Sequence, residues 1–71
     1  MDMEVKRKYV LEAIDHNERY YQLASKNRDE WIAAGAPLRG RASDPVKFWQ
    51  YQMDLCVEEL IKMRDWLKAN P

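Results

Sequence analysis

Residues 35–45 read GAPLRGRASDP, and this stretch divides the chain into two parts. It contains both glycines of the sequence and two of its three prolines. Glycine readily adopts the left-handed backbone conformation that ends many helices, and proline cannot continue a helix because it lacks a backbone N–H. No comparable break occurs on either side. We therefore predict an all-α fold in which two helices are joined by a loop over residues 35–44.

The first predicted helix spans residues 3–34. Asp2 precedes it, and an aspartate carboxylate at this position can accept hydrogen bonds from the free N–H groups of the first turn. Gly35 supplies a left-handed C-cap, and Pro37 follows two residues later. Local sequence signals thus predict both ends of this helix.

The second predicted helix spans residues 45–69. Ser43 or Asp44 can cap its start, and Pro45 lies at its first turn, where a missing N–H costs nothing. Because the connection is short, the two helices are expected to lie antiparallel. The whole chain, residues 1–71, is then a single helical-hairpin domain.

The apolar residues of the second helix follow two sets. The first set recurs at alternating steps of three and four, which is the spacing of a heptad seam. Its members are Val46, Trp49, Met53, Cys56, Leu60, Met63 and Leu67. The second set lies on roughly the opposite side of the helix and comprises Phe48, Tyr51, Leu55 and Trp66. One partner helix cannot cover both sets, so the second set either forms another interface or lies scattered on the surface.

The first helix carries a more polar stripe. Every seventh residue belongs to it, with further apolar residues on the same face. The repeating positions are Met3, Val10, Asn17, Ala24 and Trp31, and the flanking ones are Ala13, Ile14, Tyr20, Tyr21 and Ile32. Asn17 stands in the middle of the stripe. A buried amide there would fix the register or the oligomeric state at some cost in stability, whereas an exposed one would have no such role.

A chain of 71 residues has little volume in which to build a core. Small domains compensate with disulfides, metals or association. One cysteine and one histidine exclude an intrachain disulfide and a conventional zinc site, so association remains. We predict a homodimer in which two hairpins form a four-helix bundle. Its predicted core residues are Val10, Ile14, Asn17, Tyr21, Trp49, Met53, Cys56, Leu60, Met63 and Leu67.

The equal numbers of basic and acidic residues argue against some classes of binding partner. Twelve basic and twelve acidic residues give a formal net charge of zero, which removes the broad positive field of a protein held to nucleic acid by phosphate contacts. The first ten residues, MDMEVKRKYV, lack the apolar core of a signal peptide, and no apolar run approaches the length of a membrane span. We expect a cytoplasmic protein without membrane contacts.

Catalysis is not expected. Glu12 and His16 are one helical turn apart and Asp15 is adjacent, so a carboxylate could orient the imidazole as a general base. No motif places a nucleophile to receive it, and a surface ion pair explains the same spacing. Cys56 lies on the heptad seam and is predicted to be a small buried residue rather than a reactive thiol. We expect no cofactor and no metal.

The loop contains the densest positive charge. Arg39, Gly40 and Arg41 precede the N-terminus of the second helix, where free N–H groups and the helix dipole favour an anion. This core resembles that of the AT-hook, a minor-groove-binding peptide, over three residues only. Leu38 and Ala42 stand where that motif has prolines. The alternative function is therefore a nucleic-acid-binding regulator that uses the Arg39/Arg41 loop and the start of the second helix, including Lys47. Arginines that pair with Asp44 or solvate the turn would imply no such function.

Aromatic residues favour a different function. Eight tryptophans, tyrosines and phenylalanines are more than one hairpin can bury. Aromatic side chains near a surface, with arginine beside them, are typical of protein interfaces. The sequence therefore predicts a small non-enzymatic adaptor or inhibitor that binds a larger protein. The candidate partner-binding residues are Phe48, Tyr51, Leu55, Trp66, Arg39 and Arg41.

Overall fold

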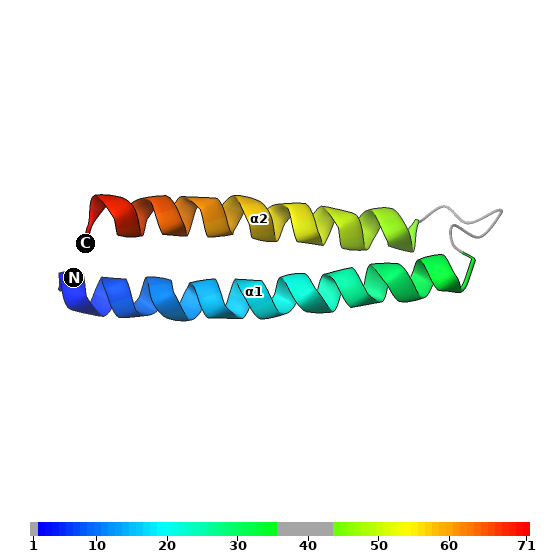
Figure 1. Cartoon of the computed structure of the whole chain (residues 1–71), viewed down its shortest axis with the longest axis horizontal. Coiled ribbons are helices and arrows are strands. Elements are labelled where there is room, and N and C mark those ends of the chain that lie inside the picture. The colour runs from blue at the N-terminus through cyan, green and yellow to red at the C-terminus, as the bar shows by residue number, and fades with distance from the viewer. Residues whose placement is uncertain (1, 36–43) are drawn as a thin grey trace.

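Two long α-helices lie side by side and run in opposite directions (Figure 1). The computed structural model describes residues 2–35 and 44–71. Helix α1 spans Met3–Ala33 and helix α2 spans Pro45–Ala69. The predicted all-α hairpin is confirmed, with α2 at its predicted bounds and α1 one residue shorter than predicted. The N- and C-termini lie together at one end of the hairpin.

Both helices begin at an aspartate cap. The carboxylate of Asp2 accepts a hydrogen bond from the backbone N–H of Glu4 at 3.1 Å. At the start of α2, Asp44 Oδ1 accepts from the backbone N–H groups of Val46 at 2.9 Å and Lys47 at 3.3 Å. These bonds satisfy donors that have no partner within the helix. Asp44 is therefore the cap of α2.

Helix α1 ends at a glycine in the left-handed region. Gly35 has a φ of +89°, and its N–H donates to the carbonyl oxygen of Ile32 at 3.0 Å. One residue earlier, the N–H of Ala34 donates to the carbonyl oxygen of Glu30 at 3.0 Å. Any residue with a Cβ would be strained at this φ, so the predicted role of Gly35 as the helix stop is confirmed.

The core is a thin seam between the two helices. Its buried side chains are Ala24 of α1 and Met53, Cys56 and Leu60 of α2. The three from α2 are consecutive members of the predicted heptad seam. Ala24 is fully buried, and its side chain is a single methyl group. Among the described residues, no large side chain is fully enclosed.

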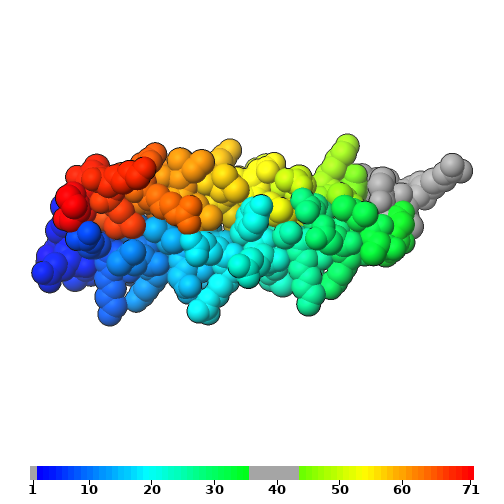
Figure 2. Space-filling model, in the orientation of Figure 1, coloured from blue at the N-terminus to red at the C-terminus, as the bar shows by residue number. Residues whose placement is uncertain are grey.

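The hairpin is long relative to its mass (Figure 2). Its principal extents are 52 × 18 × 16 Å, and its radius of gyration is 16.1 Å, against about 11 Å for a compact domain of this length. The chain exposes 5666 Å², roughly 1,000 Å² more than a compact monomer of 8.5 kDa. The elongated shape therefore leaves more surface in contact with solvent than a compact fold would. Neither described helix is both long and apolar enough to cross a membrane.

Candidate interaction surfaces

Twelve large apolar or aromatic side chains in the described residues keep more than a third of their surface exposed. Single exposed apolar residues are ordinary, but a set this large on so small a protein is not. The set comprises Met3, Val5, Tyr9, Leu11, Leu23, Trp31, Ile32, Phe48, Tyr51, Leu55, Val57 and Ile61. Where these residues lie around the hairpin decides whether they can form binding surfaces.

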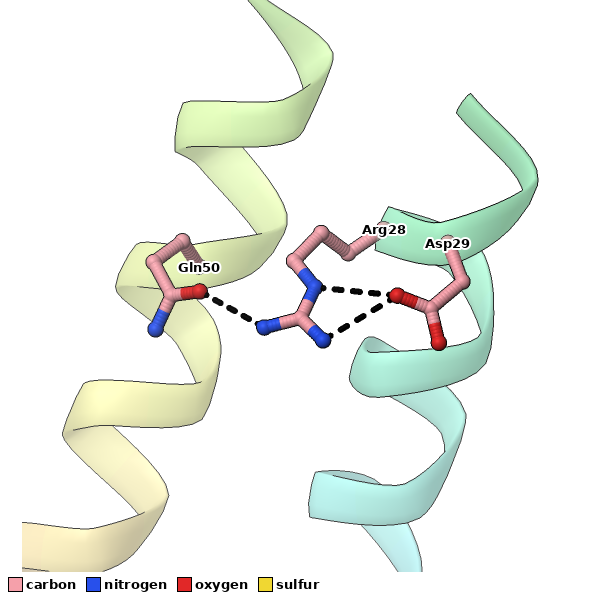
Figure 3. A network of polar contacts seen from close by, with 3 residues as sticks. All are labelled: Arg28, Asp29 and Gln50. Carbon is pink, nitrogen blue, oxygen red and sulfur yellow. Dashed lines mark hydrogen bonds and ion pairs between the residues drawn. The ribbon is translucent and has the colours of Figure 1, made fainter. Parts of the chain in front are cut away.

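Polar contacts between the helices define one flank of the hairpin. Arg28 Nη1 donates to Gln50 Oε1 at 2.8 Å, and the same guanidinium also bonds to Asp29 (Figure 3). Further from the loop, Arg64 Nη2 donates to Glu18 Oε1 at 2.6 Å. Gln50 and Arg64 are fourteen residues apart on α2, which is close to four helical turns, so both contacts lie on the same side of the helix.

Two exposed aliphatic residues of α2 lie between these polar contacts. Val57 follows Gln50 by seven residues, and Ile61 follows four residues later, so both share the stripe that ends at Arg64. The exposed fractions of Val57 and Ile61 are 42% and 55%. This arrangement is an apolar centre with a polar group at either end.

Helix α1 adds two half-buried residues to the same flank. Tyr21 precedes Arg28 by seven residues and follows Glu18 by three, and Ile14 precedes Tyr21 by seven. Both are half-buried in the hairpin. We call this set, the aliphatic residues Ile14, Val57 and Ile61 with the aromatic ring of Tyr21 beside them, the aliphatic window.

The sequence analysis assigned Val57 and Ile61 to no surface. Their spacing of four residues places them on one face of α2. That spacing alone does not show whether the face lies next to α1. Only the two cross-helix contacts show that this stripe borders α1.

The opposite flank carries three of the six predicted partner-binding residues. The hydroxyl of Tyr20 donates to Gln52 Oε1 at 3.3 Å and marks this side. Phe48 lies four residues before Gln52 and Leu55 three residues after it, and Tyr51 shares a face with both because it follows Phe48 by three residues and precedes Leu55 by four. All three are exposed, and Tyr51 keeps 60% of its surface. We call Phe48, Tyr51 and Leu55 the aromatic patch.

The ring of Phe48 has a fixed neighbour. It meets the ring of Trp49 edge to face, with centroids 5.0 Å apart and an interplanar angle of 78°. Trp49 itself is half-buried in the seam. Because such a pair favours one ring orientation, Phe48 is held in place although half of it is exposed.

Trp66 lies apart from the aromatic patch. It is eleven residues beyond Leu55, which is about 16 Å along the helix axis. The ammonium group of Lys6 sits 4.9 Å from the centre of its ring, and the side chain is half-buried. The structure brings together Phe48, Tyr51 and Leu55, while Trp66 takes part in the packing of the hairpin's own ends.

The ten predicted dimer-core residues are all at least partly covered within the single hairpin. Three are buried and seven are half-buried. The buried ones are Met53, Cys56 and Leu60, and the half-buried ones are Val10, Ile14, Asn17, Tyr21, Trp49, Met63 and Leu67. A partially covered seam of this kind can still be completed from outside.

Asn17 uses its side chain within its own helix. Its Nδ2 donates to the carbonyl oxygen of Ala13 at 2.8 Å, and the residue is half-buried. The amide is therefore satisfied without a partner from α2. Its predicted role in fixing a register between copies stays a hypothesis.

The residues considered for acid–base chemistry are spread on the surface. Glu12, Asp15 and His16 are all exposed, and Asp15 pairs with Arg19 at 3.2 Å. The predicted burial of Cys56 is confirmed, and this burial raises the pKa of its thiol. A thiol in such a setting stays protonated and reacts slowly.

The arginines of the loop, Arg39 and Arg41, lie outside the described residues. Asp44, the acidic residue considered as their pairing partner, is described, and its Oδ1 caps α2. Comparison of the chain with protein families, with characterised proteins and with solved structures found no significant match.

Proposed function

We propose that this chain is a non-enzymatic protein-binding regulator that acts as a helical homodimer. The observation that supports the proposal is that the hairpin buries few apolar side chains and leaves many exposed. Four side chains are buried, while twelve large apolar or aromatic ones stay more than a third exposed among the described residues. Apolar surface in water favours association at roughly 25 cal/mol for each Å² removed from solvent.

Pairing of two hairpins supplies the missing burial. A standard protein interface removes about 800 Å² from each partner. The chain exposes roughly 1,000 Å² more than a compact monomer of its mass, so one such interface accounts for most of the excess. Two hairpins stacked with their helices nearly parallel or antiparallel form a four-helix bundle, and the half-buried seam residues then border the shared core.

The aromatic patch is the proposed surface for the regulated protein. Phe48 and Tyr51 are large, exposed rings, and Leu55 extends the same face one turn beyond Tyr51. Rings of this kind contribute strongly to protein interfaces because they bury much area with few rotatable bonds. The partner we expect is an amphipathic helix or groove with a complementary apolar stripe.

A capture experiment tests this function. Tagged wild-type protein is compared in host lysate with the double variant Phe48→Glu and Leu55→Glu. A matched control introduces the same two negative charges on the outer face of α1 through Gln22→Glu and Ala33→Glu, both at exposed positions. Wild type and control should capture the same protein at high salt, and the patch variant should lose it while keeping its helicity and oligomeric state.

Three results would contradict the proposal. Capture that survives the patch variant removes the aromatic patch as the binding surface. Loss of helicity in that variant shows that the patch belongs to the core. Capture that falls steeply with salt and fails with Arg39→Ala and Arg41→Ala favours nucleic acid as the ligand instead.

A further inference from the structure

We infer that the second copy of this chain docks on the aliphatic window, Ile14, Tyr21, Val57 and Ile61, and that the aromatic patch stays on the outside of the dimer. The inference rests on the proposed homodimer and names its face. The two candidate surfaces lie on opposite flanks of the hairpin, so one can be occupied while the other remains free.

The chemistry of the window suits contact between identical copies. Its centre is aliphatic, and the Arg28–Gln50 and Arg64–Glu18 contacts close its two ends. Interfaces are commonly built in this way, with a dry apolar centre and a polar rim. Val57 and Ile61 lack any polar atom in the side chain, so burying them leaves no hydrogen-bonding group unpaired.

The position of the window also suits a twofold axis. In a symmetric dimer, residues near the axis meet their own copies, so a charge placed there would face a like charge. Val57 is the middle residue of Pro45–Ala69. An axis that passes perpendicular to the helices near Val57 therefore lets two antiparallel hairpins overlap along their full length.

The polar rim is complementary under this symmetry. Gln50 lies seven residues before Val57 and Arg64 seven residues after it. An antiparallel pairing about Val57 thus places Arg64 of one copy beside Gln50 of the other. Gln50 Oε1 already accepts from Arg28, but Gln50 Nε2 donates to Asp54 Oδ1 at 3.2 Å, so the carboxylate of Asp54 is the group that the guanidinium meets.

The aromatic patch is less suited to such pairing. Its residues occupy positions 48 to 55, in the half of α2 nearest the loop. A twofold axis through the patch would overlap only about half of each α2 and would leave the remaining apolar surface in water. An off-centre surface is better matched to a different protein, which has no symmetry to satisfy.

Cross-linking of single-cysteine substitutions tests the face. Val57→Cys, Tyr51→Cys and Gln22→Cys are each treated with a short bis-maleimide at micromolar protein concentration. The native Cys56 is buried and its pKa is raised, so the new thiol reacts first. Val57→Cys should give a covalent dimer, whereas Tyr51→Cys and the outward-facing Gln22→Cys should not. Equal or stronger cross-linking through Tyr51→Cys would overturn the inference.

Sedimentation equilibrium supplies the second measurement. Ile61→Glu should raise the dissociation constant of the dimer by at least about 100-fold, because a carboxylate would lose its water at the centre of the interface. Leu55→Glu, on the opposite flank, should leave the dissociation constant unchanged. A dimer that dissociates with Leu55→Glu and not with Ile61→Glu refutes the face but keeps the homodimer. If Ile61→Glu prevents folding, the cross-linking result decides.

The failure of the proposed function is distinguishable from the failure of this inference. A folded, monomeric wild-type chain at micromolar concentration would refute both the homodimer and its face. Capture of a protein through Phe48 and Leu55 could still be measured in that case, and it would support protein binding by a monomer. A dimer with the inferred face and no capture would leave the inference standing without the regulatory role.

Discussion

The ammonium group of Lys6 lies 4.9 Å from the centre of the Trp66 ring, and this contact joins the start of α1 to the last turn of α2. A cation over an indole face is attracted by the electron density of the ring. Trp66 is half-buried, whereas Phe48 and Tyr51 are exposed. The paired ends of the hairpin are thus held by a ring that the sequence alone had grouped with the aromatic patch.

Replacing Lys6 with Gln should lower the free energy of unfolding by about 0.5–1 kcal/mol through loss of this cation–π contact. Urea denaturation at fixed protein concentration measures the change. Lys8→Gln is the matched control, because it removes the same charge from the same turn of α1 on the far side of the helix. Equal effects of the two variants would mean that the charge matters and the ring does not.

Ala24 has no exposed surface, so a larger side chain there has nowhere to go. Ala24→Leu should destabilise the hairpin by about 1–3 kcal/mol, since the helices must separate or the new side chain must leave its preferred rotamer. Thermal unfolding checks this against Ala33→Leu, which makes the same change at an exposed position. Unchanged stability of Ala24→Leu would show that the seam has unfilled space.

Asn17→Leu should stabilise the chain by about 1 kcal/mol, because leucine buries apolar surface where the amide only bonds back to its own helix. If Asn17 also fixes the register between copies, the same variant should populate additional oligomeric states. Thermal unfolding and sedimentation velocity measure the two effects. A variant with the wild-type oligomeric state would count against the register role.

Burial raises the pKa of the Cys56 thiol above its ordinary value. The unfolded chain then loses the thiol proton at a lower pH than the folded chain does. Stability from this group is therefore complete below the ordinary thiol pKa of 9.0 and declines as the pH rises from there toward the folded pKa. Urea denaturation between neutral and alkaline pH should show this decline in wild type and a smaller one in Cys56→Ala. If the stability of wild type and of Cys56→Ala falls equally with pH, the Cys56 thiol does not contribute to the decline.

The bounds of the helices were readable from the sequence because their signals are local. Asp2 and Asp44 bond to N–H groups two or three residues away, and Gly35 stops α1 through its own φ. The heptad seam was readable for a similar reason. An apolar face repeats along one helix, and Met53 and Leu60 are buried by whichever helix covers that face.

Only the tertiary structure decided which flank each remaining apolar residue occupies. The sequence gives the angular position of Val57 or Trp66 around α2. Whether that position faces α1, a flank or solvent depends on the rotation of α2 relative to α1. That rotation is set by the burial of Ala24 of α1 with Met53 and Leu60 of α2 between the helices. It brings Arg64 to Glu18, forty-six residues away in the chain. Contacts between residues so distant in the chain leave no periodic trace in either helix. The two flanks of the hairpin therefore became distinct only when the helices were packed.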